Sequence, residues 1–374
     1  MKKFCAFISV ALALIMIFPS YIFADKVTDD RSNAADDRSA DDIHISADCA
    51  TLYSYDTKKF IYNKNANIRH SMASTTKIMT ALIAIENSSM EDIVTVDSRA
   101  VGIEGSSVYL RDKETISMEN LLYALLLQSA NDAAAAIAYD IAGSIESFAD
   151  MMNEKALELG AKDTHFTNPH GLDDDNHYTT AQDLAKIAAA ALSDETFRNI
   201  VSCRQKTITS DDGEIVRVLI NHNKMLRIYD GAFGVKTGYT KKTGRCLVSC
   251  AERDGVTLIC VTLDAPDDWD DHACLLDFGF TLLVPVKIAN EGEIRFAVEV
   301  LNGDKAEVTV ANSDALSVVL PKNDENVTVK TDINKTLIAP IKKGDVLGRL
   351  NVYKDGRLCA SSALIATENI KAKK

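Results

Sequence analysis

The sequence predicts an α+β domain followed by a small all-β module, and three observations support this. Strand-like segments near residue 50 precede a long block with the apolar spacing, and the Leu and Ala content, of helices. The strand pattern returns beyond Lys206, so that early and late strands can share one sheet with the helices beside it. From about Leu283 onward, alternating apolar and polar residues with glycine-containing turns are typical of an all-β module.

The elements of the first domain follow in order. Aromatic and β-branched residues flank Asp56-Thr57-Lys58, which predicts a hairpin. Residues 72–85 are apolar on nearly every side, as in a buried central helix. Further helices are expected at 118–142, at 145–160 with Gly160 as its stop, and at 180–193 with Thr180 as its cap. Strands are expected at 206–209, 216–220, 246–250 and 256–263, and a last helix at 269–278.

The first 24 residues have the pattern of a secretory signal peptide. Lys2 and Lys3 precede an apolar run that Pro19 interrupts, and Ala24 is a small residue at a cleavage position. An uncleaved membrane anchor is the alternative, because the run is just long enough to cross a bilayer, but Pro19 favours cleavage. In both cases the rest of the chain is expected to be extracytoplasmic.

Composition sets the remaining boundaries. Residues 25–42 hold seven Asp and almost nothing apolar, which predicts a disordered acidic tether. The first domain is then expected at 43–283, a C-terminal β-domain at 284–366 and a tail at 367–374. Strands of the β-domain are expected at 307–310, 317–320 and 327–330.

The formal net charge of −13 disfavours nucleic acid as a partner and electrostatic contact with anionic lipids. Membrane contact is expected only through an uncleaved N-terminus. Seven cysteines remain after Cys5 and none forms C-x-x-C, so neither a zinc site nor a disulfide framework is expected, although a single bridge is left open. Cys246 and Cys250 are expected to pack as small apolar residues.

Ser74 and Lys77 are the first candidate catalytic pair. They stand three residues apart at the start of a predicted helix, so both side chains lie on one face. A lysine acts as a base only where burial and a neighbouring cation disfavour its charged form. The apolar residues 78–85 would supply the burial, and Lys236 the cation. The alternative is a solvated helix face, because S-x-x-K is common by chance.

Ser129 and Asn131 form a second candidate group. They lie in a Leu-rich helical segment, where polar side chains must be hydrogen-bonded or face a cleft. Ser129 would pass a proton to a leaving amine, and Asn131 would orient Lys77 or a substrate amide. The alternative is a simple cap or break of the helix.

Lys236, Thr237 and Gly238 form a third group after a strand-like approach. Lys236 and Thr237 would hold a terminal carboxylate, by charge and by donation from the hydroxyl. Gly238 would let a substrate backbone come close to the strand. The alternative is a surface turn with an exposed lysine.

The three groups read S-x-x-K, S-x-N and K-T-G, the set found in penicillin-binding proteins and class A β-lactamases. Nearly the whole chain after the signal resembles the D-alanyl-D-alanine carboxypeptidases, the low-molecular-mass penicillin-binding proteins. The resemblance implies a β-lactamase/transpeptidase-like domain, an antiparallel sheet with a helical subdomain, and then a small β-domain. It also includes the segments at 72–80, 127–133, 166–172, 177–181, 235–240 and 265–269.

The resemblance implies a role for each candidate residue. Ser74 would be the acylated nucleophile, Lys77 the general base and Ser129 a further catalytic residue. The backbone N–H groups of Ser74 and Tyr239 would form the oxyanion hole. The substrate would be bound by Asn131, Lys236, Thr237 and Gly238. Ala130 departs from the glycine of many relatives, which could narrow the cleft.

The implied function is that of a serine-type D-Ala-D-Ala carboxypeptidase. It would remove the terminal D-alanine from peptidoglycan pentapeptide stems, and β-lactam antibiotics would be covalent inhibitors. No cofactor is expected, and no metal, because the spacing of His165, His170 and His177 matches no standard zinc pattern. One alternative is a β-lactamase, but the chain lacks E-P-x-x-N before Lys236. The other is a non-catalytic secreted wall-binding protein, against which the complete motif set argues.

Overall fold

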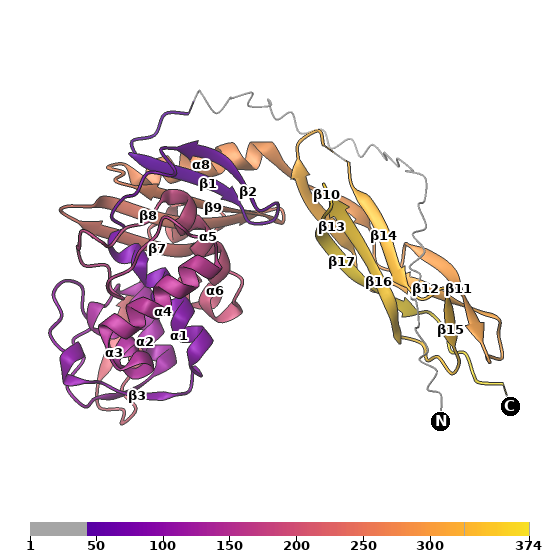
Figure 1. The fold of residues 1–374 in the computed structure, drawn as a ribbon, viewed down its shortest axis with the longest axis horizontal. Helices are drawn as coiled ribbons and strands as arrows, with labels where there is room; N and C mark the ends of the chain where they lie inside the picture. Colours follow the sequence, from indigo (N-terminus) through magenta and orange to yellow (C-terminus); the bar gives the residue numbers. More distant parts are fainter. Residues whose placement is uncertain (1–42, 325, 374) are drawn as a thin grey trace, which may run out of the picture. The chain divides into compact units, whose positions relative to one another are not determined.

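The computed structural model describes residues 43–324 and 326–373 (Figure 1). The chain divides into two compact units: a larger unit that ends at Leu283, and a β-unit that begins at Val284. The predicted signal peptide (1–24) and tether (25–42) lie outside the described residues. Among the residues that are described, no helix has the length and apolar content needed to cross a membrane.

A five-stranded antiparallel sheet runs through the larger unit in the order β2-β1-β9-β8-β7. β1 (Cys49–Ser54) and β2 (Lys59–Lys64) form the predicted hairpin. On its other side β1 pairs with β9 (Val256–Leu263), so the first and last strands of the unit are neighbours, as predicted. β8 (Gly244–Arg253) follows, and β7 (Ala232–Thr240) lies at the edge.

Helices cover both faces of this sheet. Figure 1 shows α8 (Asp268–Leu282) on one side and helices α1 to α6 on the other. The predicted caps hold: the Thr180 side chain accepts a hydrogen bond from the Asp183 amide at the start of α5, and Gly160 has φ of +71° after α4. The helices before α8 in the chain are α1 (Lys77–Asn87), α2 (Met118–Leu127), α3 (Asn131–Ala142), α4 (Ile145–Glu158), α5 (Ala181–Ala191), α6 (Glu195–Ser202) and α7 (Met225–Ile228).

Two predicted helices are interrupted at candidate site residues. The helix expected at 72–85 begins as a 3-10 turn, η2 (Ala73–Thr76), in which Ala73 has φ of +45°. The helix expected at 118–142 breaks between α2 and α3, where Ser129 has φ of +60°. Residues other than glycine seldom adopt this left-handed conformation, and hydrophobic periodicity gives no sign of it. Helices α6 and α7 were also not predicted.

Two small hairpins lie apart from the central sheet. The strands predicted at 206–209 and 216–220 pair with each other and not with the sheet. The other hairpin was not predicted. The four strands are β3 (Ile93–Thr95), β4 (Thr115–Ser117), β5 (Gln205–Thr209) and β6 (Val216–Ile220).

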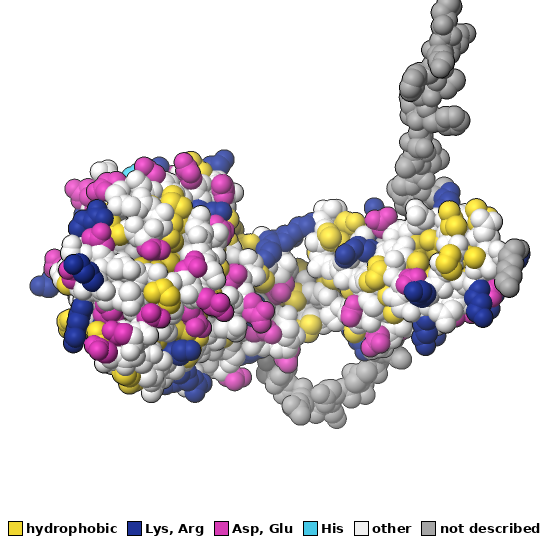
Figure 2. Space-filling model, turned by 90° about the horizontal axis from the view of Figure 1, so that it is seen from below, with side chains coloured by type: hydrophobic (Ala, Val, Ile, Leu, Met, Phe, Trp, Pro, Cys, Tyr) yellow, Lys and Arg dark blue, Asp and Glu magenta, His cyan; other side chains and the backbone are white. Residues whose placement is uncertain are grey.

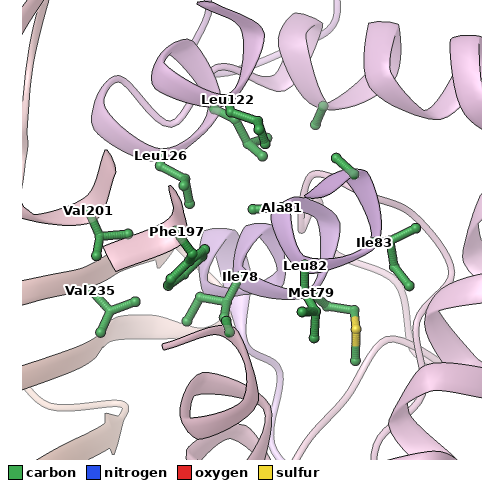
Figure 3. Packing of buried hydrophobic residues seen from close by; sticks show 14 of the residues in the cluster. Ile78, Met79, Ala81, Leu82, Ile83, Leu122, Leu126, Phe197, Val201 and Val235 are labelled. Atoms are coloured by element: carbon green, nitrogen blue, oxygen red, sulfur yellow. The ribbon is translucent and has the colours of Figure 1, made fainter. Parts of the chain in front are cut away.

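Helix α1 is the centre of the hydrophobic core, as its apolar sequence predicts. Figure 3 shows Ile78 near Phe197 of α6, while Leu122 and Leu126 of α2 lie across from Ala81. An α-helix enclosed in this way is held in one position by packing from several sides. The cysteines that the structure describes are free thiols, and Cys246 and Cys250 are buried in this core, as expected.

The β-unit contains a six-stranded sheet in the order β14-β16-β17-β12-β11-β15 and a separate pair, β10–β13. Apolar side chains alternate with exposed ones along these strands and form two small cores. Beyond β17, the chain still pairs with the unit through bridges at Ile370 and Ala372. The strands are β10 (Leu283–Ala289), β11 (Arg295–Leu301), β12 (Glu307–Asn312), β13 (Leu316–Pro321), β14 (Thr328–Ile333), β15 (Thr336–Ile338), β16 (Val346–Lys354) and β17 (Arg357–Ala366).

The surface carries charges of both signs. On the face seen in Figure 2, Lys and Arg side chains lie singly or in small groups among Asp and Glu. On this face of the described residues there is no continuous basic surface of the kind that binds nucleic acid.

Candidate active site

Ser74 lies on the η2 turn, against the edge strand of the sheet. Its side chain is half-buried, and the turn contacts β7. A methyl group at Gly238 of β7 would lie 3.0 Å from the Ser74 amide nitrogen and 3.1 Å from the Met72 carbonyl oxygen. Glycine therefore allows the strand to approach the turn that carries the candidate nucleophile.

Lys77 begins helix α1 and is completely buried. Its Nζ lies 2.9 Å from Ser74 Oγ and donates to Asn131 Oδ1 at 2.7 Å and to the His170 carbonyl oxygen at 2.5 Å. Burial, with the nearby charge of Lys236, lowers the pKa of Lys77 well below its ordinary value. A neutral amine at this position can accept the proton of the serine hydroxyl.

Ser129 and Asn131 lie at the break between α2 and α3, where both side chains are almost completely buried. Asn131 connects Lys77 to a backbone segment, because its Nδ2 donates to the Glu104 carbonyl oxygen at 2.5 Å. The left-handed backbone of Ser129 is a strained conformation of the kind that clusters in active sites.

Lys236 lies on β7 and is 2% exposed. Its Nζ donates to the Thr237 carbonyl oxygen at 2.8 Å, and burial lowers the pKa of Lys236 to about 7. Thr237 is half-buried, whereas Tyr239 is 65% exposed. Because β7 is the edge strand, the K-T-G segment presents its outer edge without a neighbouring strand.

The loop before α5 completes the surroundings of Lys77, and sequence reasoning missed this contribution. A side chain at Gly171, which has φ of +86°, would overlap the Ala73 carbonyl oxygen at 2.0 Å. This close contact brings the His170 carbonyl oxygen onto Lys77. The Asn-Pro-His-Gly segment at 168–171 was the available signal, but a backbone acceptor leaves no trace in a side-chain pattern.

Each of the three histidines considered for metal binding has its own protein partner. His177 Nε2 contacts Thr76 Oγ1 at 2.7 Å, and His165 Nδ1 contacts the Asn176 carbonyl oxygen at 2.6 Å. Leu172 N lies 3.3 Å from His170 Nδ1, and burial lowers the pKa of His170 to about 3. Within residues 43–324 and 326–373, no group of three or more His, Cys, Asp or Glu side chains could hold a metal ion.

The structure brings the S-x-x-K and S-x-N groups into direct contact through Lys77 and Asn131, and the K-T-G group lies against the Ser74 turn at Gly238. The family model of the D-alanyl-D-alanine carboxypeptidases matches residues 34–267 of this chain. The chain belongs to this family. The model of the penicillin-binding protein 5 C-terminal domain matches residues 285–372, within the β-unit.

Several relatives resemble this carboxypeptidase over most of its length. It is 31% identical to the D-alanyl-D-alanine carboxypeptidase DacF of Bacillus subtilis (strain 168), over 99% of this chain and 95% of the relative. The crystal structure of penicillin-binding protein 5 from Haemophilus influenzae matches with 28% identity and a TM-score of 0.62, over 88% of this chain and 98% of that one.

A peptidoglycan synthesis regulatory factor (PBP3) from Streptococcus pneumoniae matches with 25% identity and a TM-score of 0.72, over 88% of this chain and all of that one. These similarities confirm the predicted family and the α+β fold followed by a β-domain. The protein is therefore a serine-type peptidase of the carboxypeptidase family.

Proposed function

We propose that this carboxypeptidase removes the terminal D-alanine from peptidoglycan stem peptides through an acyl-enzyme on Ser74. One observation carries the proposal: the amine of Lys77, fully buried and with a lowered pKa, lies 2.9 Å from Ser74 Oγ. A buried amine that readily loses its proton, within hydrogen-bond reach of a hydroxyl, can activate a serine nucleophile.

Acylation begins when Ser74 Oγ attacks the carbonyl carbon of the D-Ala-D-Ala bond. The neutral Nζ of Lys77 takes the hydroxyl proton, and the backbone N–H groups of Ser74 and Tyr239 stabilise the tetrahedral oxyanion. The C–N bond then breaks. The Ser129 hydroxyl gives its proton to the leaving amine of D-alanine and receives the proton that Lys77 took from Ser74, so Lys77 is neutral again. The serine ester of the shortened peptide remains.

Deacylation reverses these roles with water as the nucleophile. Lys77 removes a proton from the water as it attacks the ester carbon, and the C–O bond to Ser74 breaks. The serine oxygen recovers its proton, and the tetrapeptide leaves. β-Lactam antibiotics would acylate the same serine, since their ring amide presents an equivalent carbonyl carbon.

Substrate docking is assigned to the edge strand. The ammonium of Lys236 and the hydroxyl of Thr237 would hold the terminal carboxylate, and Asn131 would contact the peptide amide. The absence of a side chain at Gly238 would leave room for an extended backbone beside β7. Because peptidoglycan lies outside the cytoplasmic membrane, this function requires an extracytoplasmic location, in agreement with the signal-peptide pattern of residues 1–24.

The test is release of D-alanine from a diacetyl-Lys-D-Ala-D-Ala peptide. We expect release by the wild type and by the exposed control Ser193→Ala, but none by Ser74→Ala. Fluorescent penicillin should label the first two proteins and not the third. Labelling that survives Ser74→Ala would exclude Ser74 as the nucleophile, and fast multiple turnover of a chromogenic cephalosporin would favour a β-lactamase.

A further inference from the structure

A backbone segment at residues 104–110 encloses Asn131. The Asn131 amide donates to the Ser106 carbonyl oxygen at 2.7 Å, and its side chain donates to the Glu104 carbonyl oxygen at 2.5 Å. A methyl group at Gly105 would lie 2.8 Å from Asn131 Nδ2. Held by this segment through its backbone amide and one Nδ2 hydrogen bond, Asn131 directs its side-chain carbonyl oxygen to Lys77 Nζ at 2.7 Å.

Asp132, the next residue, ties the same segment to helix α3. Its carboxylate is almost fully buried, at 1% exposure. It accepts hydrogen bonds from Ser107 Oγ at 2.6 Å, from the Leu110 amide at 3.0 Å and from the Val108 amide at 3.2 Å. A buried carboxylate is tolerated only when such donors replace water, so the segment and Asp132 depend on each other.

A second anchor holds the far end of the segment. Arg217 of β6 donates to the Val108 carbonyl oxygen at 2.7 Å and to the Tyr109 carbonyl oxygen at 3.0 Å. The same guanidinium pairs with both carboxylate oxygens of Glu114, at 2.6 and 2.8 Å. Tyr109 has φ of +58°, so these contacts hold the backbone in a strained conformation.

We propose that Asp132 is a positioning residue for acyl transfer. By holding the 104–110 segment it fixes Asn131, and through Asn131 it fixes the amine of Lys77 beside Ser74. The inference rests on the proposed function of Ser74 and Lys77. Its physical basis is that a displacement of about 1 Å in a reacting group can cost about 10²-fold in rate.

The charge of Asp132 supplies a readout that a purely structural role would not change. The groups that face Lys77 are Lys236 on β7, Asp132 on α3, and His170 and His177 in the loop before α5. The Asp132 carboxylate opposes the lowering of the Lys77 pKa. In the pH–rate profile of acylation, loss of this charge should therefore move the acidic limb, where protonation of Lys77 lowers the rate, to lower pH. Loss of the positioning contacts should lower the plateau, the pH-independent maximum of the rate.

The experiment measures the second-order rate constant for acylation by fluorescent penicillin from pH 5 to 9. Asp132→Asn should lower the plateau about 10²-fold and shift the acidic limb to lower pH. Asp140→Asn makes the same substitution at an exposed position of the same helix and should behave as the wild type. A slower variant whose limb does not move, or a variant that reacts like the wild type, would overturn the proposal.

A second variant keeps the test valid if Asp132→Asn does not fold. Ser107→Ala removes one donor to the carboxylate and leaves its charge in place. We expect a fall in the plateau of roughly tenfold, at the lower end of what one lost hydrogen bond to a charged group costs, with an unchanged acidic limb. No change would contradict the proposal. Failure of the wild type to react would instead reject the proposed function.

Discussion

The larger unit and the β-unit place polar groups in their interiors in different ways. The larger unit buries charged side chains, among them Lys77, Lys236 and Asp132. Within the described part of the β-unit, the buried polar side chains are the neutral Asn312 and Ser362. Burying ionisable groups is costly. The hydrogen bonds that Lys77 and Lys236 donate go to neutral acceptors and not to a carboxylate, so their burial indicates that this part of the larger unit gives up stability for chemistry, whereas the described part of the β-unit buries no ionisable side chain.

Backbone strain follows the same division. In the larger unit, Ala73 and Ser129 adopt positive φ beside the candidate nucleophile and in the second motif. In the β-unit the non-glycine residues with positive φ are Asn302, Asn323 and Asp355, within the described range. Asn and Asp tolerate this conformation far better than Ala or Ser, so these positions are ordinary turns.

The strongest test of this division is Lys77→Met. Removal of the general base should slow acylation and D-alanine release by about 10³-fold. Stability should not fall, because the substitution replaces a buried ionisable side chain, whose desolvation is costly, by an apolar one of similar length. Penicillin labelling and thermal unfolding would be measured beside Lys162→Met, an exposed lysine. Wild-type labelling of the Lys77 variant would show that another group activates Ser74.

The next test is Gly238→Ala, which should displace the η2 turn. The new methyl group would lie 3.0 Å from the Ser74 amide and 3.1 Å from both the Met72 carbonyl and the Thr75 amide. A shift of the nucleophile by a few tenths of an ångström to 1 Å should reduce acylation by 10- to 100-fold, roughly. Gly255→Ala has open space around it but a φ of +79°, so it strains a turn away from the site and controls for a loss of global stability. Equal acylation rates for both variants would contradict the assigned contact.

The pH dependence of acylation should reveal the electrostatic coupling of the two lysines. Only neutral Lys77 can act as a base, so the rate should fall about tenfold per pH unit below the apparent pKa of Lys77. The charge of Lys236 helps to keep that pKa low. Lys236→Met should therefore move the acidic limb to higher pH, in addition to weakening carboxylate binding. Penicillin acylation rates from pH 5 to 9 measure this, and an unmoved limb would argue against the coupling.

The smallest effect on activity is expected in the β-unit. The Asn312 side chain accepts from the Ile294 amide at 2.9 Å and donates to the Asn290 and Asp314 carbonyl oxygens at 2.7 and 2.8 Å. Asn312→Ala should destabilise the β-unit by about 2 kcal/mol, because buried backbone groups lose their partners. D-alanine release at 25 °C should not change. A loss of activity without unfolding would show that the β-unit does more than provide a scaffold.

Much of the fold could be predicted from the sequence because local patterns determine it. The hairpin around Asp56, the cap at Thr180 and the alternating strands of the β-unit all follow from short-range preferences. The sequence could single out Ser74, Lys77, Asn131 and Lys236 as candidates because the proposed chemistry requires particular side chains at fixed spacing.

The rest depended on backbone conformation and on long-range contacts. The left-handed φ of Ser129 occurs at a residue type that gives no warning of it. The carbonyl oxygen of His170 reaches Lys77 from 93 positions away, through an atom common to all residues. The positioning role proposed for Asp132 could not be read from the sequence, because its partners include the backbone amides of Val108 and Leu110.

The pairing of β1 with β9 has a consequence for how the enzyme matures. Some 200 residues separate the two strands, so this part of the sheet closes only after β9 has left the ribosome. The K-T-G strand joins that sheet through β8, and a partly synthesised or unravelled chain should lack the complete pocket. The fraction of molecules that react with a fluorescent penicillin should then equal the fraction that is correctly folded, in crude extracts as well as in purified samples.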